Sequence, residues 1–166
     1  MSYICKIASP VGALTASSDG QSLTGLWIEG QKYFAATLDA DTEERDLEIF
    51  EWTRGWLDYY FLGNKPEITP PLAPGGSKFR QLVWNALMEI PYGTVTTYGD
   101  LAKRLSAGGN LTSARAVGGA VGHNPISIII PCHRVVGADG SLTGYAGGVE
   151  KKRQLLELEK AEITGN

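Results

Sequence analysis

Cys132 and His133 are the neighbouring side chains in this sequence best suited to nucleophilic chemistry. They follow an apolar run, residues 126–130, which is bounded by Pro125 and Pro131 and predicts a buried strand that ends at a cleft. A thiol with a pKa of about 8.5 is only a few per cent thiolate at neutral pH, and a lower pKa also weakens the sulfur as a nucleophile. Most of the acceleration must therefore come from aligning an electrophile with the sulfur and stabilising its leaving group.

A cysteine nucleophile also needs a base, and the base needs an acid that orients it. His133 can accept the thiol proton through a bridging water, because adjacent side chains on an extended segment point apart. Spacing leaves three candidates for the acid in the last predicted helix: Glu150, Glu157 and Glu159. The alternative role for a cysteine is that of a small buried apolar residue, which we expect for Cys5.

Arg115 is the one long cation in a predicted helix of small residues, 113–122. Gly118 and Gly119 lie inside this helix, where each costs about 1 kcal/mol relative to alanine. Such a helix usually needs a close approach on that side, by another helix or by a nucleic-acid backbone. Arg115 is then either a solvated surface charge or a side chain inserted into a groove or base stack.

Two parts of the chain must position these residues, and together they predict an α+β protein. Residues 1–76 predict a small strand-rich domain with one helix, ending in a Pro/Gly-rich linker at 63–76. Residues 77–166 predict a mainly helical domain that carries Cys132. The expected strands are 3–8, 11–17, 22–28 and 126–130, and the expected helices are 45–62, 79–90 (N-cap Ser77), 98–105 (N-cap Thr97), 113–122 (N-cap Thr112) and 149–160.

Composition and charge exclude several classes of protein. The chain has 166 residues, of which 43% are hydrophobic and 20% charged, so it can bury a core. It has no apolar run of the roughly 18 residues that a membrane span needs, and no signal-peptide pattern, so we expect a cytoplasmic protein. Two cysteines and two histidines predict neither a disulfide framework nor a metal site. Residues 1–77 carry 5 basic and 11 acidic side chains, whereas residues 78–153 carry 9 basic and 4 acidic ones, which slightly favours a phosphate-bearing partner for the second part.

Six stretches of the second half resemble the O(6)-alkylguanine-DNA alkyltransferases, also called methylated-DNA–protein-cysteine methyltransferases. They are PCHRVV (131–136), NPISIII (124–130), TGYAGG (143–148), ARAVGGAVGHNP (114–125), GTVTTYGDLA (93–102) and FRQLVWNALMEIP (79–91).

The resemblance implies DNA repair by direct damage reversal. A guanine alkylated on O6 (and, less readily, a thymine alkylated on O4) would be flipped out of the duplex, and Cys132 would keep the alkyl group as a thioether. Each molecule would then act once. The resemblance also implies a winged-helix-like helix-turn-helix, no cofactor, a partner that is double-stranded DNA with alkylated guanine, no membrane, and a monomer.

The resemblance further implies roles for individual residues at the reacting centre. His133 would deprotonate Cys132 through water, and Glu159 would orient His133. Asn124 would hold the backbone of the active-site turn. Tyr98 would line the pocket and could protonate the leaving base.

Other residues match those that hold the DNA and the flipped base. Arg115 would fill the gap in the duplex, with the second helix of the pair in the minor groove. The backbone carbonyl of Val135 would receive the amino group of the base. The remaining expected contacts are Thr112, Ser113, Gly118 and Gly119 with the DNA, and Tyr145 and Ala146 over the base.

Two features depart from the family pattern, and two other functions stay open from the residues alone. Ala146 stands where some members have serine, and the loop at 106–111 is longer than usual. One alternative is a noncatalytic helix-turn-helix module that senses lesions or regulates transcription, although such relatives replace the cysteine, commonly with tryptophan. The other is a cysteine hydrolase using Cys132, His133 and Glu159, for which the sequence shows no oxyanion-hole signature.

Overall fold

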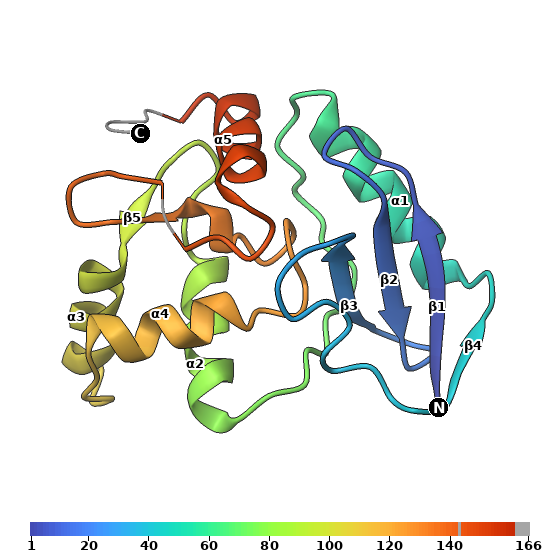
Figure 1. The fold of residues 1–166 in the computed structure, drawn as a ribbon, viewed down its shortest axis with the longest axis horizontal. Helices are drawn as coiled ribbons and strands as arrows, with labels where there is room; N and C mark the ends of the chain where they lie inside the picture. Colours follow the sequence, from blue (N-terminus) through green and yellow to red (C-terminus); the bar gives the residue numbers. More distant parts are fainter. Residues whose placement is uncertain (143, 162–166) are drawn as a thin grey trace. The chain divides into compact units, whose positions relative to one another are not determined.

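The computed structural model describes residues 1–142 and 144–161 (Figure 1). The chain divides into two compact units. The first unit consists of residues 1–75 together with 125–129, and the second of residues 76–124 together with the chain from 130 onward. The first unit therefore includes a short segment that ends three residues before Cys132 in the sequence.

The first unit is a four-stranded sheet with one long helix (Figure 1). The strand order is β3-β2-β1-β4, in which β1–β2 and β2–β3 are antiparallel and β4 runs parallel to β1. Helix α1 contributes Phe50, Leu57 and Tyr60 to the core. The bounds are β1 Ser2–Ile7, β2 Leu14–Ser18, β3 Leu23–Ile28, β4 Thr42–Glu44 and α1 Glu48–Phe61.

The acidic stretch before α1 differs from the expected helix start at about residue 45. Residues 42–44 form β4, and the helix begins at Glu48. The pairing of β4 with β1 joins segments about forty residues apart, with Ser2 opposite Thr42. A parallel pairing across that separation leaves no local pattern in the sequence.

The apolar run 126–130 is not the strand that we expected. Ile126 makes only an isolated bridge to Leu26, and the residues after it form tight turns. Ile128 has a φ of 73°, and the N–H of Ile129 donates to the carbonyl of Ser127 (2.8 Å) around it. The left-handed region is unfavourable for a β-branched residue. The apolar run therefore reflects burial rather than extended structure.

The second unit contains four helices among its described residues, with a two-stranded parallel pairing (Figure 1). Val83, Leu87, Leu101, Val117 and Val121 are buried where α2, α3 and α4 meet. The bounds are α2 Lys78–Met88, β5 Thr96–Thr97, α3 Tyr98–Ala107, α4 Ala114–Gly122, the 3₁₀ turn η1 Cys132–Arg134, β6 Val135–Val136 and α5 Val149–Leu158.

The expected N-caps of α2 and α3 are confirmed, and that of α4 is wrong. Ser77 accepts from the N–H of Arg80, and Thr97 accepts from the N–H of Asp100. At α4 the capping side chain is Ser113, which accepts from the N–H of Ala116 (3.2 Å), so the helix begins one residue later than expected. Thr112 and Ser113 are both capping types, and their order along the chain does not say which one turns the backbone.

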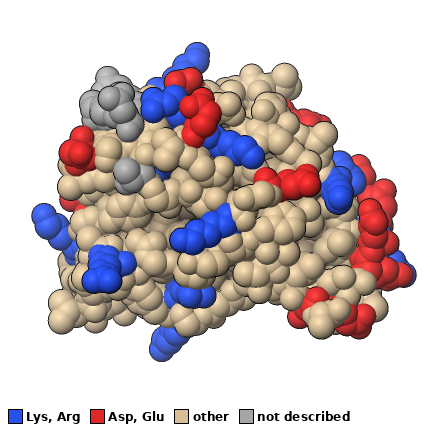
Figure 2. All heavy atoms as spheres, viewed as in Figure 1, with Lys and Arg blue, Asp and Glu red and all other residues tan. Residues whose placement is uncertain are grey.

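Charge differs between the two units. On the face shown in Figure 2, acidic side chains cluster over the part of the first unit that carries β4, while Lys and Arg are spread over the second unit. Within residues 1–142 and 144–161, none of the helices is both long enough and apolar enough to cross a bilayer.

Candidate active site

Cys132 is the first residue of η1 and is 5% exposed. Its N–H donates to the carbonyl of Ile130 (2.8 Å), which closes a tight turn around Pro131. The expectation of an extended segment here is therefore wrong, because Cys132 and His133 lie in a 3₁₀ turn. Successive side chains in such a turn point about 120° apart, so the two side chains still diverge.

Asn124 holds the turn that presents Cys132. Its Nδ2 donates to the carbonyl of Ile130 (2.9 Å), the same oxygen that accepts the N–H of Cys132. Asn124 is buried, so this amide is part of the interior of the second unit. The position of the sulfur is thus tied to a side chain at the end of α4.

The surroundings of Cys132 have opposing effects on the pKa of its thiol. Burial raises the pKa of Cys132, whereas a hydrogen bond from the side chain of Asn124 and the charge of Lys152 lower it. Burial is the larger effect, so the resting sulfur carries its proton at neutral pH. Reaction at this sulfur therefore requires a base that takes the proton.

His133 and Glu159 form a fully buried pair. The Nε2 of His133 lies 2.7 Å from Oε2 of Glu159, which follows the last turn of α5. Burial lowers the pKa of His133, although Glu159 opposes this, so the ring is neutral at pH 7. A neutral ring that donates from Nε2 to a carboxylate carries its basic lone pair on Nδ1. Of the three glutamates that spacing left open, Glu150 and Glu157 are exposed and Glu159 meets the histidine.

Arg134 completes this arrangement, and our sequence reasoning missed it. It donates from Nε and Nη2 to the two oxygens of Glu159 (2.8 and 3.1 Å), and from Nη1 to the carbonyl of Ile90 (2.7 Å). The N–H of Gly93 donates to Oε1 of the same glutamate (3.2 Å). Burial alone would raise the pKa of Glu159, but His133 and Arg134 lower it to about 2. The carboxylate that faces His133 therefore stays ionised.

Tyr98, the first residue of α3, keeps its phenolic proton. Burial, and then the charge of Cys132, raise its pKa to about 12. Gly144 makes room for it, because a Cβ there would lie only 3.2 Å from the hydroxyl, whereas a Cβ on Gly118 would lie at an ordinary contact distance of 3.7 Å from the ring. Gly144 also has a φ of 73°, which favours glycine. The protonated phenol of Tyr98 lies near Cys132 and can donate a proton there.

The expected base-binding residues lie on β6 and in the loop after it. Val135 is buried, and its N–H donates to the carbonyl of Cys132. Tyr145 and Ala146 are half-buried in the loop before α5. Thr143, which opens the TGYAGG stretch, lies outside the described residues.

The residues expected to contact DNA lie on α4 and at the two positions before it. Ser113, Arg115 and Gly119 are exposed, and Thr112 and Gly118 are half-buried. Arg115 forms no hydrogen bond or ion pair with any residue that the structure describes. A Cβ added to Gly119 would meet no described atom within 4 Å, so no neighbouring helix explains this glycine. Arg115 and Gly119 are therefore accessible on the surface of the described part of the chain.

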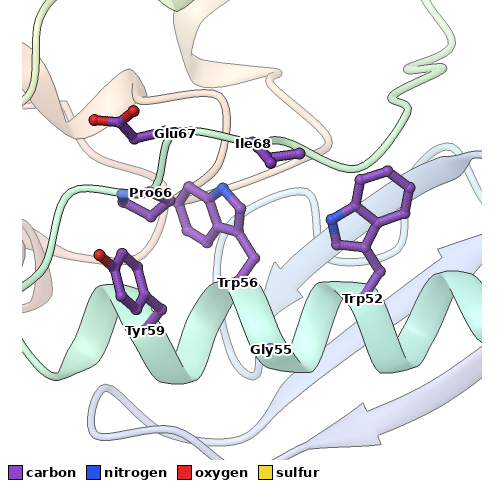
Figure 3. Close-up of a pocket in the computed structure, with 7 residues that line it drawn as sticks. All are labelled: Trp52, Gly55, Trp56, Tyr59, Pro66, Glu67 and Ile68. Carbon is purple, nitrogen blue, oxygen red and sulfur yellow. The ribbon is translucent and has the colours of Figure 1, made fainter.

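The pocket on α1 in the first unit is chemically different (Figure 3). It has a volume of about 410 Å³ and is lined mainly by aromatic and apolar residues, with the indole N–H of Trp56 unpartnered among the described residues. Its lining contains neither cysteine nor histidine: Trp52, Gly55, Trp56, Tyr59, Pro66, Glu67 and Ile68. The described part of the chain also brings no group of three or more His, Cys, Asp or Glu together around a metal position. The reactive groups therefore gather at Cys132.

Both halves of the chain match models of a known family. The 6-O-methylguanine DNA methyltransferase DNA-binding domain matches residues 78–161, and the ribonuclease-like domain of the same proteins matches residues 3–74.

Relatives match over nearly the whole chain as well. A methylated-DNA–protein-cysteine methyltransferase of Haemophilus influenzae is 46% identical over 95% of this chain and 86% of its own length. A methylated-DNA–protein-cysteine methyltransferase of Methanosarcina acetivorans is 42% identical over 95% of this chain and 97% of its own length. The crystal structure of Mycobacterium tuberculosis OGT in complex with DNA superposes with a TM-score of 0.84 at 44% identity, covering 95% of this chain and 92% of that one.

Proposed function

The chain belongs to the 6-O-methylguanine DNA methyltransferase family, and we propose that Cys132 is its alkyl acceptor, used once and irreversibly. Its activity is that of a methylated-DNA–protein-cysteine methyltransferase, which repairs O6-methylguanine in DNA. The observation that carries the proposal is the buried Cys132 thiol beside the neutral His133, whose ring is held by an ionised Glu159.

The proposed reaction exchanges one alkyl group for one proton. Nδ1 of His133 takes the thiol proton through a water, the sulfur attacks the alkyl carbon, and the bond from that carbon to O6 breaks. The electron pair of this bond stays on the guanine, which takes a proton from Tyr98. The proton held by His133 restores Tyr98 through solvent. The products are a neutral thioether on Cys132 and an unmodified guanine, so the balance requires no cofactor.

The target base reaches the sulfur by flipping out of the duplex. In this proposal Arg115 fills the space that the base leaves, and the small residues of α4 lie against the minor groove. Two features support this: Arg115 is exposed without a protein partner among the described residues, and a Cβ on Gly119 would meet no described atom within 4 Å. The flipped base would lie between the Val135 carbonyl and the loop with Tyr145 and Ala146.

The remaining parts of the proposal concern assembly and location. The protein binds DNA. We propose a monomer that acts in the cytoplasm on double-stranded DNA containing alkylated guanine, with O4-alkylthymine as a poorer substrate.

Stoichiometry tests this function against the two alternatives. The protein is incubated with excess duplex carrying one radiolabelled O6-methylguanine, and labelled protein is counted over time. We expect transfer to stop at one methyl group per molecule. Cys5→Ala is the matched control, because Cys5 is buried in the other unit and its thiol pKa is raised to about 11. A lesion-sensing module would bind the duplex without becoming labelled, and a hydrolase would release methyl groups over many turnovers.

A further inference from the structure

Lys152 has no exposed surface, although it lies in a run of three cations on α5. Its neighbours Lys151 and Arg153 are both partly exposed. Removing an ammonium from water carries a large free-energy cost unless the interior compensates for it. A lysine is therefore retained in this position against a penalty that leucine or methionine would avoid.

The ammonium of Lys152 is connected to Cys132 through one residue. Its Nζ donates to the carbonyl of Val135, and the N–H of Val135 donates to the carbonyl of Cys132. The backbone of Lys152 is fixed as well, since its N–H donates to the carbonyl of Gly148 (3.1 Å) in the first turn of the helix. The charge is thus held at a defined place beside η1.

The electrostatic coupling between Lys152 and Cys132 acts in both directions. Burial lowers the pKa of Lys152 to about 8, and the negative charge on Cys132 opposes this. The charge of Lys152 in turn lowers the pKa of Cys132. Tyr98 from α3 also responds to Cys132, since burial and then the charge of Cys132 raise its pKa. The other ionisable groups of η1 and of the end of α5 are His133, Arg134 and Glu159, which interact with one another. Arg134 is bound to Glu159, so that pair offsets its own charge.

We infer that Lys152 is a positioning residue for the transfer reaction, whose buried ammonium is the countercharge of the Cys132 thiolate. The inference rests on Cys132 being the alkyl acceptor. Lys152 keeps its proton throughout, because the thiol proton leaves through His133. The ammonium stabilises the sulfur only while the sulfur is negative, that is, between deprotonation and attack, so it favours the attacking state over the resting thiol. The hydrogen bond from Lys152 also fixes the Val135 carbonyl, which we expect to accept from the amino group of the base.

Thiol reactivity measured without DNA tests this inference separately from the proposed function. The rate of Cys132 alkylation by iodoacetamide is measured from pH 5 to pH 10 in a Cys5→Ala background, for the parent protein and for Lys152→Gln. Glutamine retains a donor for the Val135 carbonyl but removes the charge. We expect Lys152→Gln to react about tenfold more slowly at pH 7 and to approach the parent rate at high pH, since one pKa unit changes the thiolate fraction about tenfold.

Lys151→Gln is the matched control, because it removes the same charge from the adjacent position of the same helix. An unchanged pH profile in Lys152→Gln would overturn the inference, as would an equal shift in Lys151→Gln. A purely structural lysine would change stability while leaving the midpoint of the profile in place. If the thiol responds as expected but takes no methyl group from DNA, the proposed function fails while the countercharge stands.

A second measurement covers the case in which Lys152→Gln does not fold. The pKa of Lys152 is followed by NMR of its Cε in the parent protein and in Cys132→Ser, whose hydroxyl does not ionise. Because coupling is reciprocal, we expect the pKa of Lys152 to be lower in Cys132→Ser. Equal values in the two proteins would overturn the inference.

Discussion

Arg134 and Glu159 form a two-point ion pair, in which Nε donates to Oε1 (2.8 Å) and Nη2 donates to Oε2 (3.1 Å). The planar guanidinium fixes the plane of the carboxylate, which in turn accepts from Nε2 of His133. The orientation of the proposed base therefore depends on a residue that is its own neighbour in the sequence. Glu159 thus holds both His133 and Arg134 in place.

Replacing Arg134 should destabilise the fold and slow transfer together. Arg134→Met leaves the buried carboxylate of Glu159 without its cation, and breaking a buried pair in this way costs about 3–5 kcal/mol. We expect Arg134→Lys to lose less stability, because it keeps the charge and loses only the two-point geometry. Urea unfolding of both variants measures the loss of stability, and single-turnover kinetics with methylated duplex measure the loss of transfer rate. An Arg134→Met protein as stable as the parent would show that the ion pair contributes nothing net.

Glu159→Gln should reduce the methyl-transfer rate about 10- to 100-fold, the usual effect of removing a group that orients a functional histidine. The amide can still accept from His133, but it no longer stabilises the positive charge that His133 gains when it takes the proton. Glu157→Gln on the same helix is the control, since Glu157 is exposed and should transfer at the parent rate. Single-turnover kinetics with methylated duplex compare the three proteins. Similar losses in both variants would remove the special role of Glu159.

Acid should destabilise the protein through the same pair. The pKa of Glu159 is lowered from 4.5 to about 2 in the folded state, so its contribution is complete above about pH 4.5 and is lost as the pH falls toward 2. The difference corresponds to roughly 3 kcal/mol. The pKa of His133 is lowered from 6.5 in the folded state, so His133 adds a further loss of stability that begins as the pH falls through 6.5.

The free energy of unfolding, measured from pH 7.5 to pH 3, checks this dependence. Glu159→Gln should show a shallower decline than the parent below pH 4.5. Parallel curves for the two proteins would contradict the assignment of this acid sensitivity to Glu159.

Arg115→Ala should weaken capture of a base-paired lesion more than capture of the free modified base. The duplex must be opened and its gap filled, whereas the free base needs only the pocket. Transfer rates from methylated duplex and from free O6-benzylguanine provide the two readouts, with Lys32→Ala in the first unit as a surface-charge control. Equal losses on the two substrates would count against insertion of Arg115 into the duplex.

Local sequence patterns predicted much of the fold, whereas contacts between distant segments left no pattern in the sequence. Ser77 and Thr97 were identified as caps because a capping side chain and the helix after it are contiguous. The α+β class and the family resemblance are also confirmed. The strands β4, β5 and β6 were missed, since each is two or three residues long and pairs with a distant segment. The run before Cys132 was mistaken for a strand because burial alone gives the same apolar pattern as a strand.

The sequence likewise predicted some residues of the site and not others. Cys132 and His133 were recognised from their types and adjacency, but spacing alone did not choose among the three glutamates. Arg134 was overlooked because an arginine beside a histidine has no distinctive signal of its own. Lys152 was hidden in a run of three cations, of which only the fold shows which one is buried.

Peptide mapping by mass spectrometry after reaction with methylated duplex tests the central claim most directly. The protein is mixed with a duplex carrying one O6-methylguanine, digested, and compared with protein exposed to the unmodified duplex. We predict one added methyl group per molecule, on the peptide that contains Cys132, and a peptide containing Cys5 that is unchanged. A duplex that binds tightly while Cys132 stays unmodified would contradict the account.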